Sequence, residues 1–230
     1  NVQARENETK NRTSTGSGTT HTTRGATFIN NGTINSTNFN FDSTTALSGA
    51  GTWAASNISI NSSGNVSISG NNVAFGSTNI VNFFINPGGV LNPNTRTVTM
   101  KGTANTVNFT LNANGTTFNS GIFQTQGTVT MNLRNSSNFN SPLKVNTGQT
   151  FGFNDNSGNT GNLYNTLTVD LKAVFSVASG GYTVWANNNV TNNGTINGSG
   201  SSFTMSGDNF ANSGTVNPTH FNFNDTTSIS

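Results

Sequence analysis

The 230-residue sequence contains no cysteine and very little charge. Without cysteine the chain has no disulfide framework, no thiolate zinc site and no cysteine nucleophile. Charged residues make up 7% of the sequence, against roughly 25% in a typical soluble domain. From residue 25 to residue 95 the only charged side chain is that of Asp42. Such a chain cannot assemble the row of Lys and Arg contacts that binding to nucleic-acid phosphates requires, so no nucleic-acid partner is expected.

Long apolar runs are also lacking. No run approaches the ~18 to 20 residues of a membrane-spanning helix, so no membrane insertion is expected within this segment. The chain opens on Asn1 without Met or a signal peptide, and it ends inside a repeat unit, so a processed piece of a longer protein is expected. A chain without Cys, poor in Lys and rich in Asn and Thr indicates an extracellular location, at or outside a bacterial cell surface.

Asn, Thr, Ser and Gly supply 134 of the 230 residues, and all four are weak helix formers. Apolar and polar residues instead alternate in short runs, which predicts half-buried strands. The runs are residues 57–60, 66–68, 73–75, 98–100, 107–111, 129–133 and 167–171. Asn-Gly, Ser-Gly and Gly-Gly pairs between them are typical of turns. The sequence therefore predicts an all-β chain.

An internal sequence repeat indicates which kind of all-β architecture the chain forms. Residues 32–41 (GTINSTNFNF) recur as residues 214–223 (GTVNPTHFNF), in register through all ten positions. Residues 192–197 (NNGTIN) match residues 30–35, and a similar hexapeptide follows at residues 212–217. The alternating runs at 107–111 and 129–133 have a comparable spacing. A period of about 20 to 22 residues predicts the stacked turns of a β-solenoid, with an antiparallel sandwich or barrel as the alternative.

The composition suits a stack of this kind. Strands about 4.8 Å apart bring like residues into register, so Asn amides can hydrogen-bond from turn to turn as ladders. Stacked like charges would repel each other, which explains the scarcity of Lys and Glu. The 17 Phe residues are expected to lie inside, in contact from turn to turn.

The chain divides into two parts at residue 24. Residues 1–24 contain only two aliphatic side chains, Val2 and Ala4, and six of the sixteen charges. Such a stretch buries too little apolar surface to order itself, so it is predicted to be a flexible arm or one that pairs with a neighbouring subunit. Residues 25–230 are predicted to form the solenoid domain.

Residues that could perform chemistry are few. Glycoside hydrolysis needs two carboxylates roughly 5 to 10 Å apart, but no two of the acids beyond residue 24 are close in sequence. These acids are Asp42, Asp155, Asp170, Asp208 and Asp225. Asp42 and Asp225 each follow a Phe-Asn-Phe unit, where a role in a turn is expected.

The two histidines and the rare large aromatic residues complete the candidates. His21 lies in the arm, and His220 stands where the other repeat copy has Asn38, so His220 is expected at the surface. With two distant His and no Cys, no metal site and no cofactor are expected. Trp53, Tyr182 and Trp185 are expected to fill or cap the core, with an exposed carbohydrate- or protein-binding patch as the alternative.

The segments at residues 30–41, 73–79 and 191–223 resemble the repeat region of bacterial autotransporter passengers, closest to the vacuolating-cytotoxin-like (toxin-like outer-membrane) group. The resemblance is carried by a few short motifs, and the general composition and alternation of residues extend it over most of residues 25–230. It implies a right-handed parallel β-helix, export through the outer membrane and display at the cell surface. It implies no functional residue, because no pore or receptor site of that group maps onto this chain.

Together these observations predict a non-enzymatic extracellular rod, a passenger segment used in adhesion or structural display. Its expected partner is a host-surface protein or a glycan. The alternative is a self-assembling subunit of a pilus-like or biofilm filament, joined through residues 1–24. A carbohydrate-active enzyme is disfavoured by the scarcity of acids.

Overall fold

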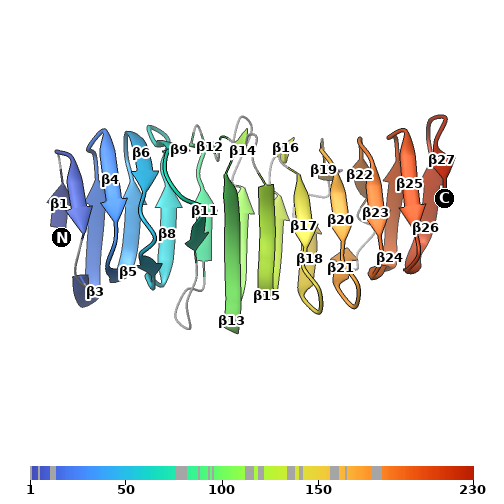
Figure 1. Ribbon diagram of the computed structural model, residues 1–230, viewed down its shortest axis with the longest axis horizontal. Coiled ribbons are helices and arrows are strands. Elements are labelled where there is room, and N and C mark those ends of the chain that lie inside the picture. The colour runs from blue at the N-terminus through green and yellow to red at the C-terminus, as the bar shows by residue number, and fades with distance from the viewer. Residues whose placement is uncertain are drawn as a thin grey trace.

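The computed structural model of the chain is a long stack of β-strands, with the two termini at opposite ends (Figure 1). No helix occurs among the residues that the structure describes. These residues are 2–4, 6–10, 14–75, 82–87, 89–92, 94, 96–111, 117–118, 122–133, 138–139, 142–155, 161–163, 165–177 and 183–230.

The strands form three parallel stacks, here called sides 1, 2 and 3, which the chain visits in that order on every turn. Side 1 contains β1 (Val2–Ala4), β8 (Asn57–Ile60), β11 (Asn82–Ile85), β18 (Thr150–Asp155) and β21 (Val174–Val177). Side 2 contains β2 (Glu8–Lys10), β4 (Thr27–Asn30), β6 (Thr44–Ser48), β9 (Asn65–Ile68), β12 (Val90–Asn92), β14 (Thr117–Phe118), β16 (Asn138–Phe139), β19 (Gly161–Leu163) and β22 (Thr183–Ala186). Side 3 contains β7 (Thr52–Trp53), β10 (Val73–Phe75), β17 (Leu143–Val145), β20 (Leu167–Val169), β23 (Val190–Asn192), β25 (Asn209–Asn212) and β27 (Ser228–Ile229).

Six longer strands run round a corner and belong to two sides, so all 27 strands join in one hydrogen-bonded sheet. Four of them pass from side 3 to side 1: β3 (Ser14–Thr23), β5 (Thr33–Phe41), β13 (Thr97–Leu111) and β15 (Ile122–Leu133). The other two, β24 (Thr195–Met205) and β26 (Thr215–Phe223), pass from side 1 to side 2.

Successive turns stack residue upon residue, so that each turn adds one residue to a column. On side 1 the register runs through Val2, His21, Phe39, Ile58, Phe83, Phe109, Met131, Phe153 and Val177. The runs 107–111 and 129–133 pair directly, and so do residues 195–197 and 215–217. The predicted repeat period is therefore confirmed at these places. Every pairing of the described strands is parallel, and the fold is the predicted right-handed parallel β-helix and not an antiparallel sandwich or barrel.

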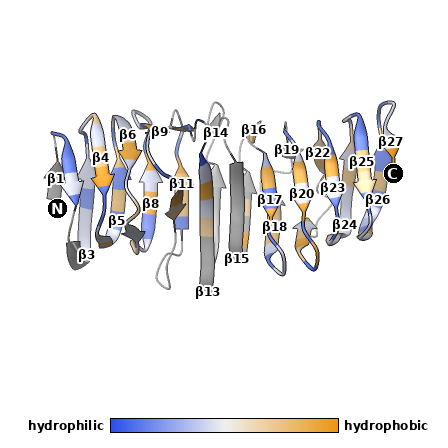
Figure 2. Cartoon of the chain, viewed as in Figure 1, coloured by the Kyte–Doolittle hydropathy of each residue, from blue (hydrophilic) through white to orange (hydrophobic). Residues whose placement is uncertain are grey.

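The core follows from the alternation in the sequence. In strands such as β8 and β11 every second residue is buried, and hydrophobic and hydrophilic residues are interspersed along the strands (Figure 2). Aromatic rings inside the stack touch from turn to turn, as from Trp53 to Phe75 and on to Phe83. Most of the described Phe residues therefore lie inside, as predicted, and Trp53 lies in the core at 1% exposure. The exceptions are Phe84 on the outward face of β11, the half-buried Phe221, and Phe223, which is 42% exposed.

One predicted strand is too long. The run 167–171 is expected to alternate throughout, but β20 ends at Val169. Leu171 is 61% exposed and sits in a turn closed by the bond from the Ala173 N–H to the Asp170 carbonyl. Lys172, in the same turn, has a φ of 60°, which a strand does not allow.

Residues 1–24 differ from the flexible or subunit-pairing arm that their composition predicts. Their described residues form β1, β2 and β3, which pair in register with β3, β4 and β5. The physical reason is the stack itself, because the next turn supplies a full row of backbone donors and acceptors to a segment that has little apolar surface of its own. The described part of this segment, from β1 to the end of β3, is here called the first turn of the solenoid, and its last residues, 20–23, lie on side 1 directly above β1.

The internal repeat is longer than its ten most obvious residues. Half of the positions from 8 to 41 recur unchanged at the corresponding positions of 190–223. The copies lie on different sides, because Phe39 belongs to side 1 while its counterpart Phe221 belongs to side 2. The offset between the two copies is therefore not a whole number of turns.

The chain turns the corner in the same way in both copies, through a glycine with a positive φ whose N–H donates to a Thr side chain of the next turn. In β3 the register shifts between Gly16 and Thr20, and Gly18 has a φ of 79°. The N–H of Gly18 donates to Thr37 Oγ1 of the next turn at 2.8 Å. In β24 the N–H of Gly200, with a φ of 77°, donates to Thr219 Oγ1 at 2.7 Å. A left-handed conformation of this kind favours glycine, which explains why a Gly-Ser-Gly segment recurs at both corners.

Candidate functional site

Asn side chains form hydrogen-bonded ladders along the outside of the stack. Asn57 Nδ2 donates to Asn38 Oδ1 at 2.9 Å, and Asn82 Nδ2 donates to Asn57 Oδ1 at 2.8 Å. At the lower end Asn38 Nδ2 donates to Thr20 Oγ1 at 3.2 Å. Each amide both donates and accepts, so turns are joined by uncharged side chains as well as by the backbone. This is the ladder that the composition predicts.

A second ladder ends on the exposed ion pair Arg24–Asp42. Asn86 Nδ2 donates to Asn61 Oδ1 at 2.8 Å, and Asn61 Nδ2 donates to Asp42 Oδ1 at 2.6 Å. The other oxygen of Asp42 accepts from Arg24 Nη2 at 3.2 Å. Asp42 lies directly after β5, at the turn where the sequence predicts it, and its carboxylate also terminates the ladder.

A surface hollow of about 320 Å³ opens at this ladder end, lined by Arg24, Asp42, Asn61, Ser62 and Ser63. Its one carboxylate, that of Asp42, is held by Arg24 on one oxygen and by Asn61 on the other. Glycoside hydrolysis would need a second carboxyl group on the opposite side of a sugar. The described lining residues therefore supply polar contacts to a ligand but no acid–base pair.

The corners contain a buried Asn that organises the Asn-Gly-Thr motif. Asn192 is fully buried, and its Nδ2 donates to Asn212 Oδ1 at 2.8 Å and to the Thr215 carbonyl at 3.0 Å. Its Oδ1 accepts from the Gly194 N–H at 3.2 Å. A Cβ at Gly194 would overlap the carbonyl oxygen of Ala173 in the turn below. The hydrogen bonds of Asn192 and the close backbone contact at Gly194 thus explain why Asn and Gly occur at these two positions of the Asn-Asn-Gly-Thr segment.

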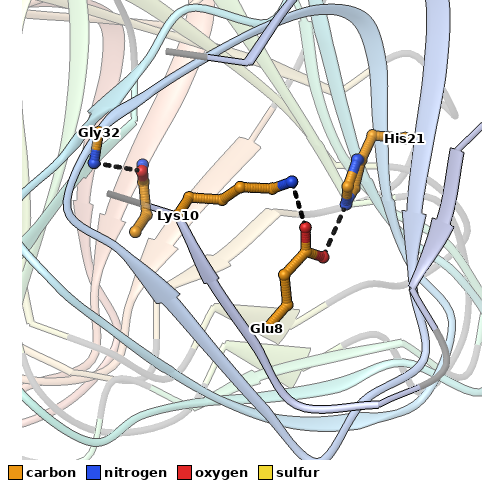
Figure 3. A network of polar contacts seen from close by, with 5 residues as sticks. Glu8, Lys10, His21 and Gly32 are labelled. Atoms are coloured by element: carbon orange, nitrogen blue, oxygen red, sulfur yellow. Dashed lines mark hydrogen bonds and ion pairs between the residues drawn. The ribbon is translucent and has the colours of Figure 1, made fainter. Parts of the chain in front are cut away.

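The most unusual group of the described residues is a charged cluster inside the first turn, made of Glu8, Lys10 and His21 (Figure 3). Glu8 Oε2 lies 3.1 Å from His21 Nε2, and Glu8 Oε1 forms an ion pair with Lys10 Nζ. The His21 side chain is 5% exposed. Its ring stacks on Phe39, with ring centres 4.9 Å apart and planes 9° apart, and meets the edge of Phe28 at 6.1 Å.

Burial governs the ionisation of His21. Removal from water lowers the pKa of the imidazole below its ordinary value of 6.5, because the charged form loses more hydration than the neutral form. The carboxylate of Glu8 acts in the opposite direction by charge and by hydrogen bond, and the ammonium of Lys10 lowers the pKa further. At neutral pH the cluster therefore holds one anion, one cation and a neutral ring.

Comparison of the two repeat copies shows that these three positions are core positions. Residues 8, 10 and 21 correspond to Val190, Asn192 and Phe203, all of which are buried. Sequence reasoning assigned Glu8, Lys10 and His21 to a solvated arm and missed the cluster. The signal that would have found it is the alignment of residues 8–41 with residues 190–223, in which charged residues face apolar or amide ones.

The remaining candidates are scattered. His220 is exposed on β26, as predicted, and Asp170 pairs with Lys144 at 3.2 Å. Trp185 is half-buried between the inward Val184 and Ala186, so it lies on the outer surface of β22, unlike Trp53. Asp208 and Asp225 lie in exposed bends. Tyr182 and the side chain of Asp155 lie outside the described residues.

Within the described ranges no three His, Asp or Glu side chains come together to hold a metal ion. In those ranges no helix has the length and apolarity needed to span a bilayer.

No protein-family model, curated protein or solved structure matches the chain. What the chain does must therefore be argued from its own residues.

Proposed function

We propose that this chain is a non-enzymatic rod segment of a protein displayed outside a bacterial cell, where it serves in adhesion or in holding binding surfaces away from the point of attachment. The observation that carries the proposal is the uninterrupted stack between the two termini (Figure 1). Ten stacked steps from β1 to β26 on side 1, at ~4.8 Å each, make a rod about 50 Å long.

The surface chemistry supports an extracellular rod. Turns are joined by backbone hydrogen bonds and by neutral ladders such as Asn38–Asn57–Asn82. Interactions between neutral groups are not screened by salt, unlike those of exposed ion pairs. A rod joined in this way keeps its shape across the ionic strengths found outside a cell. The resemblance of residues 30–41, 73–79 and 191–223 to autotransporter passengers supports the same assignment.

The filament alternative needs residues 1–24 to be free for pairing with another subunit. The described part of this segment is already paired with β3, β4 and β5 of its own chain. The arrangement therefore favours a discrete rod over a subunit joined through an arm.

Two measurements on the purified full chain test the proposal. Negative-stain electron microscopy and sedimentation velocity at micromolar concentration are expected to show separate short rods. Long regular filaments would instead support the alternative. Beads coated with the chain are then expected to bind epithelial cells or a glycan-coated surface better than beads coated with albumin, and no polysaccharide tested should be cleaved.

The chain offers a matched pair of variants for the adhesion assay. Trp185 and Thr183 both point outward on β22, and exposed Trp residues often dominate binding energy. Trp185→Ala is expected to reduce bead binding more than Thr183→Ala. Beads that bind no better than albumin would refute the adhesive role and leave only structural display, and release of sugar fragments would refute the non-enzymatic assignment.

A further inference from the structure

A charged layer inside a solenoid calls for an explanation, because the side chains of Glu8 and Lys10 are only 15% and 24% exposed and the removal of an ion pair from water can cost more free energy than its mutual attraction returns. The second repeat copy shows that this fold accepts Val190, Asn192 and Phe203 at the same three positions. The cluster of Glu8, Lys10 and His21 is therefore not required by the geometry of a turn.

The strands around His21 contribute no further charge. His21 lies on β3 and faces β2, β4 and β5, and β1 pairs with it from below. Among the described residues of these strands, only Glu8 and Lys10 are charged, both on β2. Protonation of His21 would place two cations and a single anion next to the buried rings of Phe28 and Phe39.

We propose that the Glu8–Lys10–His21 layer makes the first turn of the solenoid an acid-sensitive element, closed at neutral pH and opened by mild acid while the later turns stay folded. Opening would release β2 and β3 from the stack. The row of backbone groups on β4 and β5, and the rings of Phe28 and Phe39, would then become accessible. The inference is independent of the proposed function, because it concerns only the packing of this layer.

The direction of the pH dependence follows from the lowered pKa of His21. The unfolded segment, with a histidine pKa near 6.5, binds more protons than the folded one in the range just below that value. The stability of the first turn is therefore fully present above about pH 6.5 and is lost as the pH falls below it.

Hydrogen exchange with mass spectrometry on the full chain tests this at about pH 7.5 and about pH 5, after correction for intrinsic exchange rates. Protection of residues 14–23 is expected to fall by up to about tenfold for each pH unit below about 6.5. Protection of residues 196–205, the matching segment of the second copy, should not change. Equal protection of residues 14–23 at both pH values, or loss of protection along the whole chain together, would overturn the proposal.

Variants separate the histidine from other effects of acid. His21→Gln keeps a hydrogen-bonding side chain that cannot be charged, and it should remove the pH dependence of residues 14–23. A triple variant with the residues of the second copy, Glu8→Val, Lys10→Asn and His21→Phe, should do the same. His220→Asn, which uses the residue of the first copy at an exposed position, is the control and should respond to acid like the wild type.

A direct titration keeps the proposal testable if a core variant does not fold. In imidazole NMR spectra of the wild type, assigned with the help of His220→Asn, the His21 signal is expected to titrate with a midpoint below 6.5. A midpoint at or above that value, or a loss of protection in His21→Gln equal to that of the wild type, refutes the mechanism.

Discussion

Removal of one amide from the middle of a ladder measures what the ladders contribute to stability. Asn57→Ala deletes both ladder hydrogen bonds, the one donated to Asn38 at 2.9 Å and the one accepted from Asn82 at 2.8 Å, together with a long and weak one from Nδ2 to the Thr37 carbonyl at 3.5 Å. Each neutral hydrogen bond contributes about 0.5 to 1.5 kcal/mol net, so the two together contribute about 1 to 3 kcal/mol. Because the site is half-buried, water can replace part of the loss, and a destabilisation of about 1 to 2 kcal/mol is expected.

The assay is urea unfolding followed by circular dichroism, read as the shift of the midpoint at constant slope. The matched control is Asn65→Ala on the following strand β9, since Asn65 is exposed and makes no side-chain hydrogen bond to another described residue. That change is expected to stay within about 0.5 kcal/mol. A double-mutant cycle with Asn38→Ala should give a coupling energy of about 0.5 to 1.5 kcal/mol. If Asn57→Ala destabilises no more than Asn65→Ala, the ladder reasoning fails.

Three further substitutions test the packing of the core, the repulsion between stacked like charges, and the close approach of the backbone at a corner. Phe39→Ala removes a fully buried ring and should cost about 3 to 5 kcal/mol in urea unfolding, where a loss below about 1 kcal/mol would mean that the ring is not packed as described. Asn61→Asp places a second carboxylate beside that of Asp42, which raises the pKa of one of them. The folded state then binds its proton more tightly, so the loss of stability relative to the wild type should be smallest in acid and grow as the pH rises, and a difference between the two unfolding midpoints that does not depend on pH would contradict this. Gly194→Ala forces a Cβ onto the Ala173 carbonyl oxygen and should cost about 1 to 3 kcal/mol by thermal unfolding, whereas an unchanged melting temperature would show that the corner can relax.

The solenoid was predictable because its period is written into local sequence. Alternating runs such as residues 57–60 and 73–75 coincide with β8 and β10 at both ends. The pairing of residues 107–111 with residues 129–133 follows from their spacing alone. Side chains that repeat every turn must stack, so a regular fold leaves a regular trace.

The first turn could not be predicted by the same reasoning, because its residues lack the apolar pattern. Segment 1–24 looks like a solvated arm when its composition is judged alone. Its place in the stack comes from hydrogen bonds to β4 and β5, which depend on the backbone and not on side-chain type. The prediction that the strand continues to Leu171 was wrong for a related reason. The spacing of apolar residues does not reveal that the next residue, Lys172, has a left-handed backbone conformation.

The rotation between the two repeat copies bears on how such a chain can vary. Residues 8–41 and 190–223 share half their residues but lie one side apart, so the portable unit is a strand with its corner and not a full turn. Gain or loss of one such unit would change the length of the rod only slightly. Because such a unit covers only one of the three sides, its gain or loss would also rotate all later turns about the long axis of the rod. An insertion of this kind would change the direction in which the outward-facing residues of all later turns point, while their inward-facing residues would still stack in the core.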